Sequence, residues 1–187
     1  MKIILASASP RRRDLLTAAG FEFEVIPANV DETADPGLPP EELAAALSKK
    51  KALHVQPIVP GDAIIIGADT IVVTDNEILG KPKDEANAFA MLFKLQGRRH
   101  TVYTGVTILS HKLIKTFTES TSVFMRSLTE PEIRRYIATG EPMDKAGAYG
   151  IQEKGALLIK RIEGDYFTVV GLPLCRLNIE IKSMVEV

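Results

Sequence analysis

Apolar and polar positions alternate in two ways along the first half of the chain. Short apolar runs bounded by turn-forming residues predict strands, and these runs are 3–5, 21–26, 63–66 and 71–73. Apolar residues that recur every three or four positions predict helices, and these cover 10–19, 41–55 and 85–95. Strands that alternate with helices are typical of an α/β protein.

The second half departs from this alternation. Two β-rich runs, 101–110 and 113–125, lie close together in the chain and predict an antiparallel hairpin. A capping-box spacing at Thr129 begins a further helix, and a glycine-rich loop, a strand over 157–162 and a final helix follow. A hairpin within an otherwise alternating pattern predicts a mixed sheet flanked by helices.

Composition limits the classes of function. With 23 basic and 24 acidic side chains, the chain has no overall attraction for a nucleic-acid polymer or a membrane surface, and we expect neither as a partner. The single cysteine, Cys175, excludes an internal disulfide. No apolar run resembles a signal peptide or a membrane span, so we expect a cytoplasmic protein. The three histidines are isolated from one another, and we expect surface or capping roles for His54, His100 and His111.

Three arginines stand at an unusual place. Ser9 and Pro10 are typical of a helix start, yet Arg11, Arg12 and Arg13 follow in the first turn, where the helix dipole disfavours cations. One interpretation is a solvated positive turn. The other is an anion site, in which guanidinium groups and backbone amides after a strand bind phosphate. The pattern leaves both open.

A carboxylate and two basic segments are further candidates. Asp69 falls inside a buried strand pattern, where an acid needs a partner, a local backbone hydrogen bond or a metal. Lys81 follows a predicted hairpin that would bring it back beside the Asp69 strand. The run Lys49, Lys50 and Lys51 suits a solvated helix end as well as a phosphate site.

Polar residues gather where loops leave the predicted strands. They are Ser7, Arg11, Arg12, Glu32, Lys51, Asp69, Lys81 and Gln152. Cations bind polyphosphate, and carboxylates hold a hard divalent cation through oxygen ligands. This combination points to metal-assisted phosphoryl chemistry, in which positioning and charge neutralisation provide most of the catalysis.

Several segments resemble, in order, the motifs of the Maf family of nucleoside triphosphate pyrophosphatases. They are ASASPRRRDLL, VDE, GADTIV, ILGKP, TGV, DKAGAYGIQ and VVGLPL. The resemblance implies hydrolysis of a nucleoside triphosphate to the monophosphate and pyrophosphate with a divalent cation, Mg²⁺ or Mn²⁺. It also implies one domain over 1–187, a mixed elongated sheet with two lobes around a central cleft (Maf/ITPase-like), and often a homodimer.

The resemblance also implies roles for individual residues. Asp69 matches the proton acceptor that activates water, and Glu32 and Asp69 are the expected metal ligands. Cations that match those assigned to the triphosphate and the departing pyrophosphate are Arg12, Lys51 and Lys81.

Substrate selection is assigned by the same resemblance. Ser7 belongs to the substrate-binding set, and Arg11, Thr70 and Gln152 match positions linked to base selection. The glutamine resembles that of the branch that acts on dTTP and UTP, and its amide offers both a donor and an acceptor to a pyrimidine. Two alternatives stay open: a pyrophosphatase for 7-methyl-GTP or another modified purine, and a non-catalytic nucleotide-binding regulator of cell division.

Overall fold

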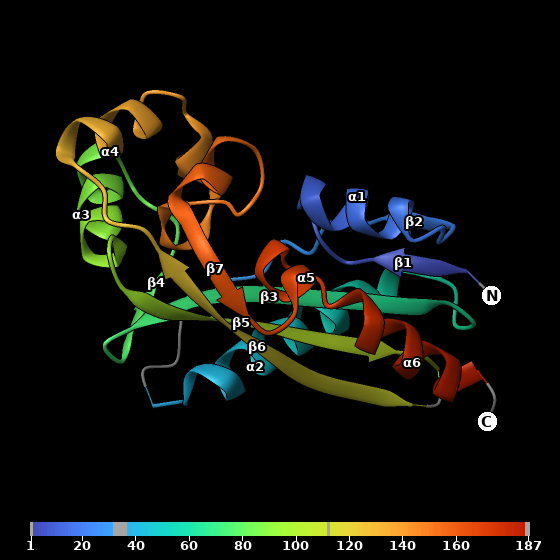
Figure 1. Cartoon of the computed structure of the whole chain (residues 1–187). Helices are drawn as coiled ribbons and strands as arrows, with labels where there is room; N and C mark the ends of the chain where they lie inside the picture. Colours follow the sequence, from blue (N-terminus) through green and yellow to red (C-terminus); the bar gives the residue numbers. More distant parts are fainter. Residues whose placement is uncertain (1, 32–36, 112, 186–187) are drawn as a thin grey trace. The chain divides into compact units, whose positions relative to one another are not determined.

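The computed structural model describes residues 2–31, 37–111 and 113–185, and its strands form a mixed sheet flanked by helices (Figure 1). Within these residues, seven strands are ordered β2-β1-β3-β5-β6-β7, and β4 pairs with β3 outside this order. Strand β1 is parallel to β2 and to β3. Strand β4 is antiparallel to β3, and β7 is antiparallel to β6. The strands are β1 Ile3–Leu5, β2 Phe23–Val25, β3 Ile64–Thr74, β4 Glu77–Leu79, β5 Arg99–Leu109, β6 Ile114–Met125 and β7 Ile159–Glu163. The predicted mixed sheet is confirmed.

The helices begin where the capping residues predict. Helix α1 starts at Pro10, and α3 is capped by the Asp84 carboxylate, which accepts from the Asn87 N–H. Helix α4 starts after Thr129, whose N–H and hydroxyl both donate to Glu132. The helices are α1 Pro10–Ala18, α2 Pro40–Val55, α3 Glu85–Leu95, α4 Glu130–Ile137, α5 Tyr166–Val170 and α6 Leu174–Val185. Among the described residues, none of these helices combines the length and hydrophobicity that a membrane crossing requires.

The chain divides into two compact units. The first comprises Met1–Asp69, Thr104–Glu119 and Gly171–Val187, and the second comprises Thr70–Tyr103 and Ser120–Val170. In the first unit, apolar residues of β1, α2 and β3 pack together around Ile4 and Ile65. In the second, α3 and α4 pack with the sheet around Leu92 and Ile133. The prediction of one domain over 1–187 stays a prediction.

Three local expectations are wrong. Strand β3 is continuous from Ile64 to Thr74, where the sequence predicted two runs. Leu157 and Leu158 belong to a 3-10 helix, Glu153–Leu158, so β7 begins only at Ile159. His100 lies inside β5 and is 2% exposed, because the strand begins two residues earlier than expected.

Candidate active site

Ser7 follows the C-terminal end of β1, and Asp69 lies in the middle of the neighbouring strand β3. Leu5 of β1 pairs with Ile66 of β3, and the Ala6 N–H donates to the Ile66 carbonyl at 2.8 Å. The pairing of the two strands therefore extends to Ala6, the residue before Ser7, and Ile66 lies three residues before Asp69 on β3.

The Asp69 carboxylate forms an ion pair with Lys51 of α2. Lys51 Nζ lies 2.5 Å from Asp69 Oδ1, and the two residues are 6% and 7% exposed. A buried charge is tolerated when a partner of opposite sign neutralises it. Within the described residues, Oδ2 of Asp69 has no hydrogen-bond partner. One carboxylate oxygen is thus held in place while the other is available to a ligand.

Gly67 explains how Lys51 can reach Asp69. A Cβ at Gly67 would collide with the Ser48 carbonyl and the Ala52 nitrogen of α2. Only glycine allows α2 to approach β3 this closely. Lys51 lies between these two contact points in the helix, so the close approach places its ammonium group beside the strand.

Arg12 is the arginine of the first turn that points inward. It is 8% exposed, its Nε donates to the Gly171 carbonyl at 2.8 Å, and its Nη1 donates to Ser7 Oγ at 3.0 Å. Arg13 is exposed and Arg11 half-buried. The two interpretations of the run thus apply to different residues: Arg12 suits an anion site, and Arg13 a solvated turn.

The lysine run divides in the same way. Lys49 and Lys50 are exposed, and Lys50 Nζ donates to the Asp31 carbonyl at 2.6 Å. Lys51 alone among the three is buried. Glu32, the second expected metal ligand, lies outside the described residues.

The remaining candidates belong to the second unit. Val72 pairs with Leu79 in the antiparallel β3–β4 hairpin. Thr70, two residues before Val72, and Lys81, two residues after Leu79, therefore lie at the same end of the hairpin. The predicted return of Lys81 towards this strand is confirmed. Thr70 is half-buried and Lys81 exposed. The Gly80 carbonyl accepts from the Gly147 N–H at 3.0 Å, which ties this end of the hairpin to the glycine-rich loop.

Gln152 lies in that glycine-rich loop, directly before the 3-10 helix Glu153–Leu158. It is half-buried, and its carbonyl accepts from the Ala156 N–H at 3.3 Å. Within the described residues its side-chain amide has no hydrogen bond. The backbone at Gln152 is therefore ordered, while the amide group remains able to contact a ligand.

A buried contact missed by the sequence analysis supports the same loop. His100 Nε2 lies 2.6 Å from the Tyr149 hydroxyl, and no described residue hydrogen-bonds to the buried Nδ1. Burial lowers the pKa of His100 to about 4, so the ring is neutral near pH 7. The alternation of the β5 run would place His100 on the same face as the buried Val102 and Thr104, a signal that was available in the sequence.

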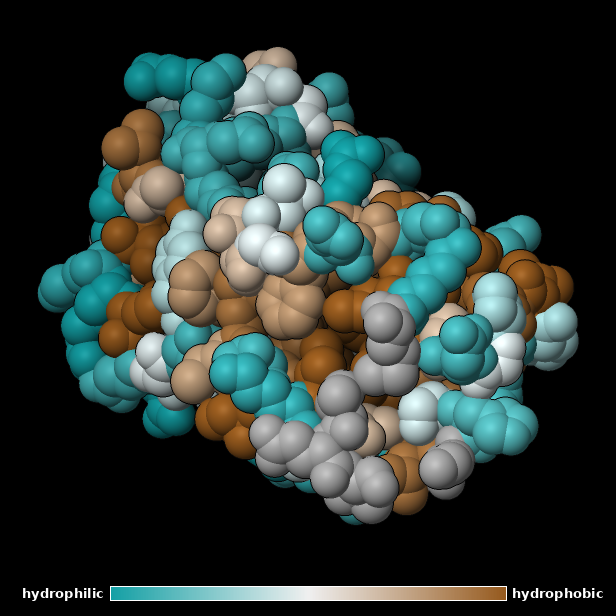
Figure 2. All heavy atoms as spheres, turned by 90° about the vertical axis from the view of Figure 1, so that its right-hand side faces the viewer, coloured by the Kyte–Doolittle hydropathy of each residue, from teal (hydrophilic) through white to brown (hydrophobic). Residues whose placement is uncertain are grey.

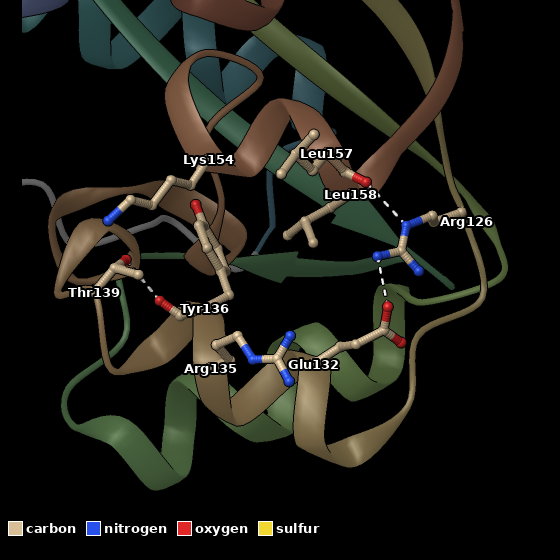
Figure 3. Close-up of a pocket in the computed structure, with 8 residues that line it drawn as sticks. All are labelled: Arg126, Glu132, Arg135, Tyr136, Thr139, Lys154, Leu157 and Leu158. Carbon is tan, nitrogen blue, oxygen red and sulfur yellow. Dashed lines mark hydrogen bonds and ion pairs between the residues drawn. The ribbon is translucent and has the colours of Figure 1, made fainter.

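A pocket of about 190 Å³ in the second unit contains none of the predicted site residues (Figure 3). It lies between α4 and the Glu153–Leu158 helix, with Tyr136, Leu157 and Leu158 beside it. Arg126 in its wall donates to Glu132 at 2.8 Å. That contact lowers the pKa of Glu132 to about 2, helped by the Thr129 N–H. These charges are bound to each other and stabilise the start of α4.

The family model for Maf-like protein matches residues 2–184. The chain belongs to the Maf-like family. A protein of Pelotomaculum thermopropionicum named dTTP/UTP pyrophosphatase is 52% identical over 184 residues, which are 97% of this chain and 96% of the relative. A protein of the same name from Geobacillus sp. (strain WCH70) is 52% identical over 183 residues, 98% of each chain. The predicted family is confirmed.

One solved structure similar to this chain is the Staphylococcus aureus Ham1 protein. It is 19% identical, covers 67% of this chain and 72% of its own, and has a TM-score of 0.42.

Proposed function

We propose that this chain hydrolyses dTTP and UTP to the nucleoside monophosphate and pyrophosphate. The observation that carries the proposal is that one unit holds two buried polar pairs, Lys51–Asp69 and Arg12–Ser7, because they combine cations for a polyphosphate with a carboxylate that keeps one oxygen available. Membership of the Maf-like family supports the same reaction. So does the name dTTP/UTP pyrophosphatase, which two relatives with 52% sequence identity carry.

Asp69 is the proposed proton acceptor. Its Oδ2 takes a proton from a water molecule as the water oxygen attacks the α-phosphorus. The bond from the α-phosphorus to the bridging oxygen breaks, and pyrophosphate leaves with the electron pair of that bond. Lys51 holds Oδ1 and so fixes the direction of the carboxylate during this transfer.

The proposed phosphate contacts come from the other cations. Arg12 is buried, and its bonds to Ser7 and Gly171 hold its guanidinium in place, where its positive charge would attract a phosphate. Lys81 is exposed at the end of the β3–β4 hairpin and would contact the departing pyrophosphate. Preorganised cations of this kind stabilise the charge that develops on the leaving group.

A divalent cation fits this donor set in one specific way. Within the described residues no group of three His, Cys, Asp or Glu side chains could hold a metal ion by itself. Mg²⁺ is usually bound by one or two carboxylates together with substrate phosphates and water, and Asp69 provides one such carboxylate. Asp69 and Glu32 would hold the ion, which supplies neutralisation of the phosphate charge.

Gln152 is the residue that we propose recognises the base. Arg11 and Thr70 are also proposed to take part in base selection. A uracil or thymine ring presents carbonyl acceptors and one N–H donor, and an amide side chain can bond to both kinds of group. The half-buried Gln152 amide, which has no hydrogen bond within the described residues, suits this role.

The test is pyrophosphate release from dTTP, UTP, CTP, GTP and 7-methyl-GTP, with Mg²⁺ and with a chelator. Release from dTTP and UTP that the chelator abolishes is the expected result. Release from 7-methyl-GTP instead would overturn the base assignment and keep the reaction. Metal-dependent nucleotide binding without release from any substrate would replace the enzyme with a nucleotide-binding regulator.

A further inference from the structure

The loop that carries Gln152 is closed into a tight turn at Gly150 and Gly155. A Cβ at Gly155 would collide with the Gly150 carbonyl and the Tyr136 hydroxyl. Glu153, inside the turn, has a φ of 53°, in the left-handed region that non-glycine residues rarely adopt. A backbone in such a conformation persists only when its surroundings hold it.

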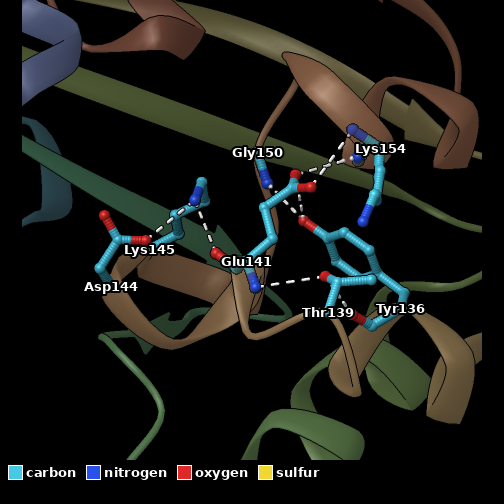
Figure 4. A network of polar contacts seen from close by, with 8 residues as sticks. Tyr136, Thr139, Glu141, Asp144, Lys145, Gly150 and Lys154 are labelled. Atoms are coloured by element: carbon cyan, nitrogen blue, oxygen red, sulfur yellow. Dashed lines mark hydrogen bonds and ion pairs between the residues drawn. The ribbon is translucent and has the colours of Figure 1, made fainter.

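Glu141 provides most of that support (Figure 4). Its Oε1 accepts from the Tyr136 hydroxyl at 2.9 Å and from the Gly155 N–H at 3.0 Å, and its Oε2 accepts from the Lys154 N–H at 3.2 Å. Hydrogen bonds to a carboxylate are stronger than those between neutral groups. Glu141 thus fixes the far end of the loop, two and three residues after Gln152.

Tyr136 fixes the near end. Its hydroxyl oxygen accepts from the Gly150 N–H at 3.2 Å while the same group donates to Glu141. Burial raises the pKa of Tyr136 far above its usual range, and the neighbouring Glu141 raises it further, so the hydroxyl stays protonated and able to donate. Both ends of the loop are therefore bound to one pair of side chains.

The backbone of Glu141 is itself fixed by two hydrogen bonds to side chains. Its N–H donates to Thr139 Oγ1 at 3.2 Å, and its carbonyl accepts from Lys145 Nζ at 2.6 Å. Lys145 Nζ also donates to Asp144 at 2.9 Å. A carboxylate whose backbone is fixed on both sides is a rigid support for other groups.

We infer that Glu141 is a positioning residue that determines base selectivity, because it fixes the backbone after Gln152 directly and the backbone before it through Tyr136, without using the Gln152 amide. The inference rests on the proposed function, since it deepens the role of the same loop. Glu141 does not itself read the base. It fixes the backbone that carries the amide, so that the donor and the acceptor of the amide face a base in one orientation.

The first variant is Glu141→Gln, which keeps the shape of the side chain but replaces one acceptor oxygen with an NH₂ donor. Three donors converge on the carboxylate, so at least one hydrogen bond is lost. We expect the ratio of kcat/KM for UTP to that for CTP to fall about tenfold, mostly through KM for UTP. The matched control is Glu153→Gln, which removes the same charge from the same loop; Glu153 accepts none of these hydrogen bonds.

The second variant is Tyr136→Phe, which keeps the ring and removes the hydroxyl that links Glu141 to Gly150. A smaller fall in the same ratio is expected. In a double-mutant cycle, Glu141→Gln added to Gln152→Ala should change the ratio by less than twofold, because the group being positioned is already absent. Additive effects in this cycle would overturn the inference.

Amide hydrogen exchange measures the positioning without turnover. In Glu141→Gln the amides of Gly150, Lys154 and Gly155 should exchange about tenfold faster, while those of α3 stay unchanged. Unchanged exchange at these three amides, or an equal loss of activity for UTP and CTP, would overturn the inference.

Failure of the proposed function gives a different pattern. If the unaltered protein releases no pyrophosphate from dTTP or UTP, the proposed function fails. The preference is then measured as the ratio of the dissociation constant of α,β-methylene UTP to that of α,β-methylene CTP. A tenfold rise in that ratio together with faster exchange would still support Glu141 as a positioning residue, and no change in either would overturn it.

Discussion

The two units hold their candidate residues in different ways. In the first, Lys51 and Asp69 bond to each other, and the Arg12 side chain bonds to Ser7 and Gly171. In the second, Gln152 has no side-chain partner within the described residues, and Glu141 and Tyr136 hold the backbone around it. Residues that must keep a charge and a direction are fixed by their own side chains. A residue that must offer its hydrogen bonds to a substrate can be fixed only through its backbone.

The largest expected effect comes from Asp69→Asn in the first unit. The amide keeps an acceptor for Lys51 but cannot take a proton from water, so kcat for dTTP should fall about 10³-fold. Far-UV circular dichroism should remain that of a folded protein. The control is Asp62→Asn, an exposed aspartate shortly before β3. Activity in Asp69→Asn close to that of the control would contradict the proton-accepting role.

The second effect tests the ion pair as a structural unit. Lys51→Met leaves the Asp69 carboxylate buried and unpaired, which should lower the free energy of unfolding by about 3–5 kcal/mol. Urea unfolding followed by circular dichroism measures this, since the chain has no tryptophan for fluorescence. Lys49→Met is the matched control, because Lys49 is exposed two residues away. Equal effects in the two variants would contradict the distinction between inward and solvated lysines.

This distinction could have been predicted from the sequence. Leu43, Leu47, Lys51 and Val55 recur every four residues, so helical periodicity alone places Lys51 on the buried face of α2. Arg12 likewise precedes Leu15 and Leu16 at helical spacing. The motifs showed which residue types were involved, and the periodicity decides which neighbour points inward.

Other features could not be predicted locally. The carbonyl that binds Arg12 belongs to Gly171, 159 residues away, and no short-range pattern encodes that contact. Helix α5 was missed because Thr168, Val169 and Val170 are β-branched and favour strands. It forms where the Asp165 carboxylate accepts from the N–H and the hydroxyl of Thr168. The family and the mixed sheet were predicted correctly, and the roles of the individual site residues stay predictions.

A third effect concerns the contact between His100 and Tyr149, which supports the glycine-rich loop of the second unit. Because burial lowers the pKa of His100 from 6.5 to about 4, the unfolded chain binds a proton between these values and the folded chain does not. The contribution of neutral His100 to the free energy of unfolding is therefore fully present above pH 6.5, and it is lost as the pH falls from 6.5 to 4. The loss from this group is about 3 kcal/mol.

The variant His100→Gln cannot take up that proton and should lack this part of the pH dependence. Unfolding free energies in urea at pH 7 and at pH 4 measure it, and the difference between the two should shrink by about 3 kcal/mol. His54→Gln, at an exposed position of α2, is the control. If both variants keep the pH dependence of the original chain, His100 does not titrate as its burial requires.

The smallest effect comes from Gln152→Glu, which replaces the side-chain amide with a carboxylate. The hydrogen bonds from the loop backbone to Glu141 and Tyr136 stay intact. A carboxylate has only acceptors, so it loses the hydrogen bond to a pyrimidine carbonyl, and kcat/KM for UTP should fall about tenfold. Pyrophosphate release from 7-methyl-GTP should rise, because that base presents N–H donors. Gln56→Glu, an exposed position in the first unit, controls for the added charge. Unlike Asp69→Asn, this variant should shift preference while keeping turnover, and equal losses on every base would mean that Gln152 serves the reaction and not the choice of substrate.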